Sequence, residues 1–295
     1  MGPTGMDRRT FLGALGVTGT IALGAECGAL ADAPVEEGEL MPAFFIGHGS
    51  PLNAVEDNRF TRGWKDAMKD VPSPTAIVCV SAHWLTRGTY VTAMSRPQTI
   101  HDYRIALREL NAVRYPAPGT PALAIQIAGA IQATSIGLDD SWGLDHAAWP
   151  ILRHAFPSAN IPVLEMSIDY RRSGTWHYNL GRELLYLRRR GVLFIGSGNI
   201  VHNLRENDLR MAYDGFEWAI EADEILKAKI RAGDHRALCA YEQLGTSVRL
   251  AVPTPDHFYP LLYVLGMQVP EDNVTIFNDA LAYGCVTMTS VRLGA

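Results

Sequence analysis

Four histidines follow a short apolar run or stand in a loop marked by proline and glycine. They are His48 in FFIGHGSP, His83 in IVCVSAHW, His202 in FIGSGNIVHN and His257 in PTPDHFYP. An imidazole at the mouth of a sheet is well placed to hold a metal ion. Each of them alone would more often be a hydrogen-bonded structural residue. The four together favour a shared metal site, although their spacing alone leaves both interpretations open.

Two other histidines and one tryptophan are candidates for roles beside such a metal. His146 in WGLDH precedes a predicted helix, where it would act as an acid or base or pair with Asp145 at the helix start. His101 in TIHDY would line a substrate pocket or serve a structural role. Trp84, next to His83, would form an aromatic wall of that pocket.

Several common catalytic signatures are absent from the sequence. It contains no GxGxxG, GxxxxGK[ST], GxSxG or HExxH motif. The segment GHGSP superficially resembles a serine loop, so Ser50 is an alternative nucleophile. A metal site explains the histidines better than a serine nucleophile does.

Length and composition set broad limits on the fold and the partners. The chain has 295 residues, of which 47% are hydrophobic, enough for one large α/β domain or two small ones. The formal charge of −5 argues against nucleic acid or an anionic membrane surface as the main partner.

Apolar periodicity predicts alternating strands and helices. The predicted strands are 43–46, 76–80, 91–93, 163–168, 192–195, 274–277 and 285–291. The predicted helices are 59–69, 122–133, 147–155, 176–190, 216–232 and 236–244, with a further apolar helix at 258–265 after His257. This alternation indicates a single α/β domain over 41–295, with a central, mainly parallel sheet between helices. Ligands bind such sheets beyond the carboxyl ends of their strands.

The pattern of residues 1–31 indicates an export signal. Arg8 and Arg9 precede an apolar stretch, and small residues up to Ala31 suggest cleavage there. The paired arginines indicate a twin-arginine signal over residues 1–31, a flexible lead-in over 32–40 and a periplasmic location. The alternatives are an uncleaved N-terminal anchor, or a lipid attached to Cys27.

Eight sequence blocks, in order, resemble the DOPA-dioxygenase branch of the class III extradiol ring-cleavage dioxygenases. The likeness runs from Met41 to Leu293. The blocks are GHGSPLNAVEDN, SAHWLTRGTYVTAM, TIHDY, RYPAPGTPALA, WGLDHAAW, IPVLEMSID, GSGNIVHNLR and PTPDHFYPLLYVLG.

The resemblance implies an α/β fold and insertion of O₂ into a catechol ring beside the diol. It implies a non-haem Fe(II), with zinc as the alternative metal. It places the metal ligands at His48, His83 and His257, and a fourth ligand or an acid/base at His202. It also matches His146 to an active-site histidine. A neutral imidazole there would take a proton from the catechol and return it during ring opening.

Two features of the sequence depart from what the resemblance suggests. Mononuclear Fe(II) oxygenases commonly use two histidines and one carboxylate, whereas Asp256 is the nearest carboxylate here and an all-histidine set also suits Zn²⁺. After TIHDY, this chain has Arg104 and three apolar residues where the family commonly has Gly-Gly-Phe-Pro. Arg104 would bind a substrate carboxylate or remain a solvated loop residue.

Three hypotheses for the function follow. The first is an exported, metal-dependent extradiol dioxygenase acting on a small catechol-type molecule and O₂, with no nucleic-acid partner and no stable membrane insertion after processing. The second is a zinc hydrolase on the same scaffold. The third is a non-catalytic periplasmic protein that binds a metal or an aromatic ligand. The sequence predicts no particular oligomeric state.

Overall fold

The computed structural model describes residues 40–294 of the chain. The predicted signal, its lead-in up to residue 39 and Cys27 lie outside the described residues and stay predictions. Of the helices in the described part, none is both long and apolar enough to cross a membrane.

Strands and helices alternate along most of the described chain. The strands are β1 (Ala43–Gly47), β2 (Ala76–Thr86), β3 (Thr89–Thr92), β4 (Gln98–Thr99), β5 (Ile136–Asp139), β6 (Gly143–Leu144), β7 (Val163–Asp169), β8 (Val192–Gly198), β9 (Val274–Phe277), β10 (Leu281–Ala282), β11 (Val286–Thr287) and β12 (Ser290–Leu293). The α-helices are α1 (Arg59–Met68), α2 (Arg108–Ala112), α3 (Pro121–Ala130), α4 (Trp149–Ala155), α5 (Gly174–Leu184), α6 (Tyr186–Arg189), α7 (Glu217–Arg231), α8 (His235–Cys239), α9 (Thr246–Ala251) and α10 (Tyr259–Gly266). Three short 3₁₀ helices are η1 (Pro51–Ala54), η2 (Leu204–Glu206) and η3 (Tyr241–Gln243).

One eight-stranded sheet organises the domain, with the strand order β5-β3-β7-β2-β8-β1-β12-β9. Its centre, β7-β2-β8-β1, is parallel throughout. The strands β12 and β9 at one edge pair antiparallel, and β3 at the other side runs antiparallel to β7. The predicted fold class, a single α/β domain with a mainly parallel sheet between helices, is confirmed.

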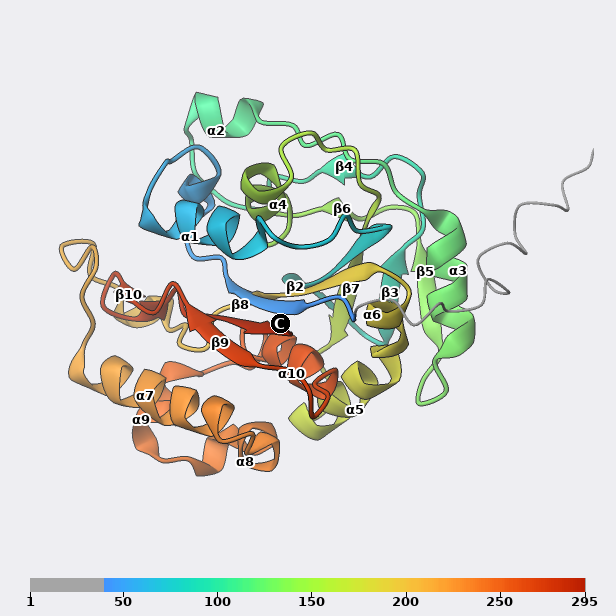
Figure 1. Cartoon of the computed structure of the whole chain (residues 1–295). Helices are drawn as coiled ribbons and strands as arrows, with labels where there is room; N and C mark the ends of the chain where they lie inside the picture. Colours follow the sequence, from blue (N-terminus) through green and yellow to red (C-terminus); the bar gives the residue numbers. More distant parts are fainter. Residues whose placement is uncertain (1–39, 295) are drawn as a thin grey trace, which may run out of the picture. The chain divides into compact units, whose positions relative to one another are not determined.

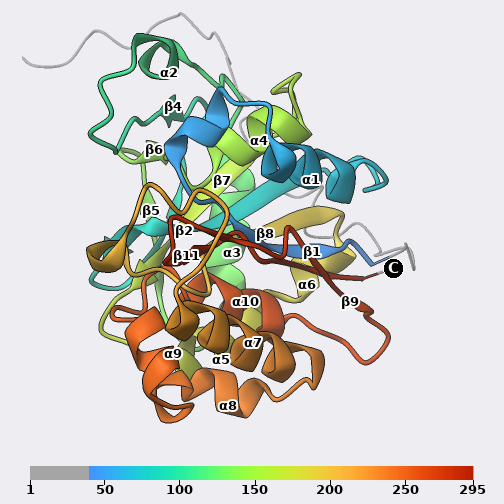
Figure 2. The ribbon, with the colours of Figure 1, turned by 90° about the vertical axis from the view of Figure 1, so that its left-hand side faces the viewer.

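Helices cover both faces of this sheet, and each face has its own core. Figures 1 and 2 show α1 and α4 on one side of the sheet and α5, α7 and α10 on the other. Because successive strand residues point to opposite faces, β1 serves both cores. Phe44 and Ile46 pack in the core under α1 and α4, whereas Ala43 and Phe45 pack toward α5 and α10. This two-sided burial explains why the central strands are continuous apolar runs.

Three predicted elements are interrupted in the structure. The predicted helix 236–244 divides into α8 and η3, which are separated at Ala240. The predicted helix 176–190 divides into α5 and α6 at Leu185, where the backbone N–H groups of Leu185 and Arg188 bond to carbonyls three residues back. The predicted strand 285–291 divides into β11, which pairs with β10, and β12, which joins the main sheet.

The sequence analysis missed several short elements, including β5, α2 and α9. Strand β5 lies at the sheet edge and is only partly buried, so its residues lack the continuous apolar run of the central strands.

Candidate metal centre

The carboxyl ends of β1, β8 and β2 bring distant parts of the chain to one edge of the sheet. In the parallel ladders, Gly47 of β1 pairs with Gly198 of β8, and Ser81 of β2 pairs with Ser197. His48 follows β1 directly, as the sequence predicted. The sheet therefore delivers the first imidazole to the position where ligands bind in parallel α/β folds.

His83 reaches this edge differently from the prediction. We expected it just after a strand, but β2 continues to Thr86 and His83 lies inside it. The pairing of β2 with β7 shifts register between Val80 and Leu85, and His83 falls within that irregular stretch. A bulge of this kind re-aims side chains and is common next to active sites.

His257 is held beside β8 by a close approach of two backbones. The carbonyl of His257 accepts a hydrogen bond from the backbone N–H of Asn199 (2.9 Å). A Cβ added at Gly198 would lie 2.0 Å from the same carbonyl oxygen, so only glycine allows this contact. The end of β8 at Gly198, with Asn199 directly after it, thus fixes the segment that precedes α10.

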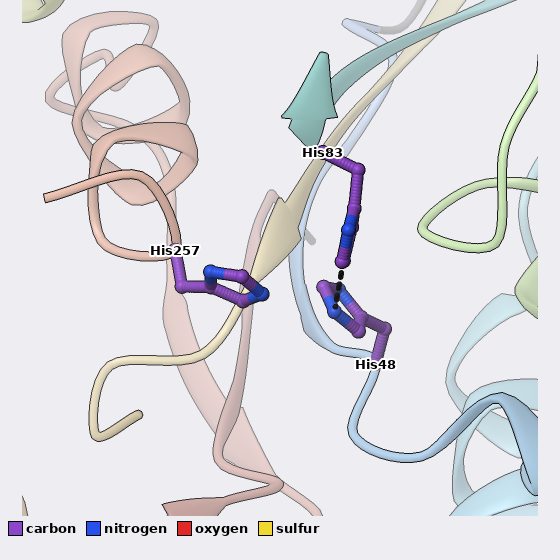
Figure 3. Close-up of side chains that lie close together, drawn as sticks. All are labelled: His48, His83 and His257. Atoms are coloured by element: carbon purple, nitrogen blue, oxygen red, sulfur yellow. Dashed lines mark hydrogen bonds between the residues drawn. The ribbon is translucent and has the colours of Figure 1, made fainter. Parts of the chain in front are cut away.

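The rings of His48, His83 and His257 converge on a common point (Figure 3). One ring nitrogen from each lies within 4.8 Å of the others. The ring centroids are 5.1 Å apart for His48 and His83, 5.2 Å for His48 and His257 and 5.0 Å for His83 and His257. These three side chains from three distant segments form the candidate metal centre.

A different group holds the Nδ1 atom of each of these imidazoles. His48 Nδ1 lies 3.0 Å from Ser197 Oγ, His83 Nδ1 lies 3.4 Å from Asp102 Oδ2, and His257 Nδ1 lies 2.5 Å from Asp256 Oδ2. Metal-binding histidines commonly donate their second N–H to a carboxylate or another acceptor, which fixes the ring orientation.

The partners of the Nδ1 atoms determine which nitrogen of His48 and of His83 carries the proton. Ser197 donates its single hydroxyl proton to the carbonyl of Ala147 (2.6 Å), so its oxygen accepts the Nδ1–H of His48. The carboxylate of Asp102 lies 3.4 Å from Nδ1 of His83, and its negative charge favours the tautomer with the proton on that nitrogen. In this tautomer the Nε2 atoms of His48 and His83, which lie 3.2 Å apart, both present lone pairs to the space between the rings.

A cation between the rings would accept both lone pairs. The short distance between the two nitrogens therefore indicates that these residues suit a metal. Bonds of about 2.1 Å to one tetrahedral ion place two ligand nitrogens roughly 3.4 Å apart. Burial, reinforced by the neighbouring histidines, holds the pKa of His48 and of His83 well below the ordinary value. Both rings are therefore neutral, which is the form that binds metals.

Two other sets of residues could hold an ion by proximity alone. They are His83, Asp102 and His146, and His202, Asp256 and His257. In both sets the carboxylate lies against the Nδ1 atom of a histidine in the three-histidine set, as described above. The carboxylates therefore orient imidazoles, and Asp256 acts as a ring partner of His257.

His202 stacks face to face on His257. Their ring centroids are 3.6 Å apart and the rings are inclined by only 8°. Burial and the neighbouring His257 lower the pKa of His202 to about 3, so its imidazole is neutral at physiological pH. The structure brings His202 to the site, but outside the set of three converging rings.

His146 faces the site from the segment before α4. Its ring centroid lies 3.9 Å from that of His83, and its Nδ1 lies 2.8 Å from Asp102 Oδ1. Burial would raise the pKa of Asp102, but contacts with His146 and His83 outweigh it and hold that pKa below the ordinary value. Asp102 stays ionised and positions both rings.

The three predicted substrate-binding residues lie elsewhere. Trp84 is buried and stacks in parallel on Trp142 with 5.5 Å between ring centroids. His101 contacts the carbonyl of Val113 (3.1 Å) through Nε2. Arg104 is exposed. None of the three is among the described residues that line the cavity at the metal centre, and their roles in binding stay predictions.

A cavity of about 700 Å³ opens in front of the histidines. Five histidines contribute to its wall: His48, His83, His146, His202 and His257. The remaining lining is Gly49, Ser50, Pro51, Leu52, Tyr103, Ile105, Leu204, Asn207, Leu209, Tyr283 and Val286. Its size is typical of a small-molecule site.

The sequence analysis did not identify two residues that orient the metal-facing imidazoles. Asp102 lies in the TIHDY block next to His101, which was singled out instead. Ser197 lies near the end of β8, beyond the strand predicted at 192–195. The role of Ser197 depends on its hydrogen bonds to His48 and Ala147, and no local sequence pattern identifies partners so far away in the chain.

Comparisons with known proteins agree with this geometry. Residues 42–294 match the family described as the catalytic LigB subunit of aromatic ring-opening dioxygenase. The chain is 41% identical over 259 residues to an Escherichia coli K12 protein named 4,5-DOPA dioxygenase extradiol, covering 86% of this chain and 95% of that protein. It is 33% identical over 267 residues to a Beta vulgaris protein of the same name, covering 86% and 98%.

A solved structure is also similar. The structure of an uncharacterized protein from Escherichia coli K12 superposes with a TM-score of 0.75 at 39% sequence identity. The match covers 86% of this chain and all of the other.

The parallel sheet and its histidine cluster define a class of enzyme that binds a metal at the carboxyl ends of its strands. Within that class, the chain belongs to the LigB family of aromatic ring-opening dioxygenases and is an extradiol ring-cleaving dioxygenase. The first of the three hypotheses is thereby confirmed in its reaction class. Family membership favours oxygenation over the alternatives of hydrolysis and non-catalytic binding.

Proposed function

We propose that the enzyme uses Fe(II), held by His48, His83 and His257, to cleave a catechol-type ring next to its diol. The convergence of one ring nitrogen from each of these histidines, with the Nε2 atoms of His48 and His83 only 3.2 Å apart, carries this proposal. When bound, Fe(II) brings the diol and O₂ together and supplies the one-electron chemistry that O₂ requires. Zn²⁺ also suits three imidazoles, but it has no redox chemistry.

The chain's own residues prepare the substrate. A catechol binds a cation as an anion, so at least one hydroxyl proton must leave. His202, whose ring stacks on that of His257 and lines the cavity, takes that proton at a ring nitrogen and returns it to the opened product. His146, whose Nδ1 lies against Asp102, donates a hydrogen bond to the bound catechol or accepts one from it, on the side of the catechol ring away from His202. Both atoms of O₂ enter the product, so the reaction consumes no further reductant.

The test is reconstitution of the metal-free enzyme without oxygen. Separate samples receive Fe(II) or Zn²⁺, followed by catechol and O₂. We expect the Fe(II) enzyme to form a yellow ring-opened product and to consume one O₂ per product, while the Zn²⁺ enzyme forms none. A fully iron-loaded enzyme that leaves all catechols intact would contradict the proposal.

We propose further that residues 1–31 direct export through the twin-arginine route. The support is the Arg8-Arg9 pair, followed by an apolar stretch and small residues up to Ala31. Changing both arginines to lysine should keep the protein out of the periplasmic fraction. Unchanged fractionation of that variant would contradict the proposal.

A further inference from the structure

The cavity has two halves with different chemistry. Its floor is made by the five histidines, whereas its outer wall includes Leu52, Ile105, Leu204, Leu209 and Val286. Of the described residues that line it, none is a lysine, arginine, aspartate or glutamate. A ligand's diol thus has polar partners at the floor, but a charged group on its far end would have no ionic partner along the wall.

The cavity is much larger than one aromatic ring. An apolar cavity of about 150 Å³ is enough to hold benzene. The volume here is about 700 Å³. A catechol seated on the histidines therefore leaves most of the outer half for a substituent.

Two leucines at the outer wall are strongly exposed. Leu204 is 54% exposed and Leu209 is 76% exposed. Exposed apolar surface that lines a cavity commonly marks a binding site, because a ligand that covers it removes that surface from water.

Backbone hydrogen bonds hold the loop that carries these leucines. The N–H groups of Asn203 and Asp208 donate to the carbonyls of Cys285 (3.1 Å) and Tyr283 (3.0 Å), and the N–H of Phe216 donates to Gly284 (2.9 Å). The loop is thus tied to the segment that supplies Tyr283 and Val286 to the cavity lining. The leucines form a fixed part of the cavity.

The charged residues near the outer wall are exposed or engaged elsewhere. Arg205 and Glu206, which follow Leu204 on η2, are exposed and lie outside the cavity lining. Asp208 and Arg210 pair with each other at 2.6 Å, and the side chain of Arg210 is 90% exposed. Arg104 is exposed and lies outside the cavity lining. A carboxylate or ammonium that packs against these leucines loses water there without gaining an ionic partner, which is unfavourable.

We infer that the substrate is an uncharged catechol carrying a large alkyl or aryl substituent, which packs against Ile105, Leu204 and Leu209. This inference rests on the proposed function, because the histidine floor must hold the diol. It sets the enzyme apart from one specialised for a catechol with an amino-acid side chain.

A matched pair of substrates tests the inference. 4-Pentylcatechol and 3-(3,4-dihydroxyphenyl)propanoate carry substituents of equal heavy-atom number, one apolar and one anionic. We expect kcat/KM to favour pentylcatechol at least tenfold. Along a series from methyl to pentyl, we expect a rise of up to about fourfold for each methylene that is buried. Equal rates for the pair, preference for the acid or a flat series would overturn the inference.

Variants of the outer-wall leucines test whether these side chains cause the preference for pentylcatechol. Leu209→Ala and Leu204→Ala should each lower kcat/KM by about threefold or more for pentylcatechol, and by less for unsubstituted catechol. The control is Leu138→Ala, which removes a leucine of β5 that is 48% exposed and outside the cavity lining. An equal loss with both substrates, or the same loss in the control, would contradict the inference.

Binding without turnover separates this inference from the proposed function. The dimethyl ethers of the same two catechols cannot chelate a metal, and calorimetry measures their binding to the purified protein. If no catechol is cleaved, the proposed function fails, but tighter binding of the pentyl ether still supports an apolar wall. Equal binding of the two ethers, or no binding of either, would overturn the inference even in an active enzyme.

Discussion

The floor and the outer wall of one cavity are built in opposite ways. At the floor, a parallel sheet delivers His48 and His83, and a separate group holds the Nδ1 atom of each ring. At the outer wall, short elements and loops outside the main sheet supply leucine, isoleucine and valine side chains, and no charged residue is in the described lining. The floor determines the reaction, and the wall selects the molecule that undergoes it. Changes at the floor should therefore abolish catalysis, while changes at the wall should redirect it.

Removal of a metal-facing ring should have the largest effect. We expect His257→Ala to lose both bound iron and ring cleavage, because two remaining imidazoles leave the ion weakly held. Metal analysis and product formation measure this. The control is His235→Ala on α8, a half-buried ring whose Nδ1 contacts Tyr178. If His257→Ala retained iron and activity at the level of His235→Ala, the assignment of the ligand would be wrong.

Removal of a charge that orients the rings should have the next largest effect. Asp102→Asn keeps the shape but loses the negative charge that holds His83 and His146. We expect a loss of about 10- to 100-fold in metal affinity or activity. Asp57→Asn is the control, since Asp57 pairs with Arg62 on the exposed surface. Equal behaviour of the two variants would show that Asp102 does not position the rings.

Removal of the serine behind His48 should have a smaller effect. Ser197→Ala deletes the acceptor for His48 Nδ1 and the donor to the carbonyl of Ala147, and leaves both groups buried without that partner. We expect the free energy of unfolding to fall by about 1–3 kcal/mol, with a loss of metal affinity of about tenfold. Urea unfolding and metal titration measure these changes. Ser141→Ala, at an exposed turn, should alter neither quantity.

The smallest effect is expected at Arg104. The residue is exposed and lies outside the cavity lining, so Arg104→Ala should change the free energy of unfolding by less than about 0.5 kcal/mol. Its kcat/KM for an alkylcatechol should remain within about twofold of the parent enzyme. A large, selective loss with carboxylate-bearing catechols would instead support a role for Arg104 in binding that carboxylate.

The sequence predicted the floor because the floor depends on local patterns. An apolar run followed by glycine and histidine indicates the carboxyl end of a buried strand, and this pattern placed His48 correctly. Loop patterns also singled out His257 and His146, the family resemblance assigned their roles, and the structure brings both to the same cavity. The parallel centre of the sheet followed from the alternation of strands and helices.

The sequence did not predict the outer wall or the groups behind the rings. Leu204 and Leu209 are ordinary loop residues until backbone bonds to Tyr283 and Cys285 fix them over the cavity. Contacts such as that between Ser197 and His48 join residues far apart in sequence, and no periodicity encodes them. The position of His83 inside β2 depends on a register shift, which pairing across the sheet determines.

The central claim is that His48, His83 and His257 hold one catalytic iron. Anomalous diffraction at the iron edge, from crystals of the Fe(II)-loaded enzyme kept without oxygen, tests it most directly. The account predicts a single strong peak at about 2.1 Å from one ring nitrogen of each histidine, with Asp102 and Asp256 remaining on the far side of their rings. A peak bound by either carboxylate, or one distant from these three imidazoles, would contradict it.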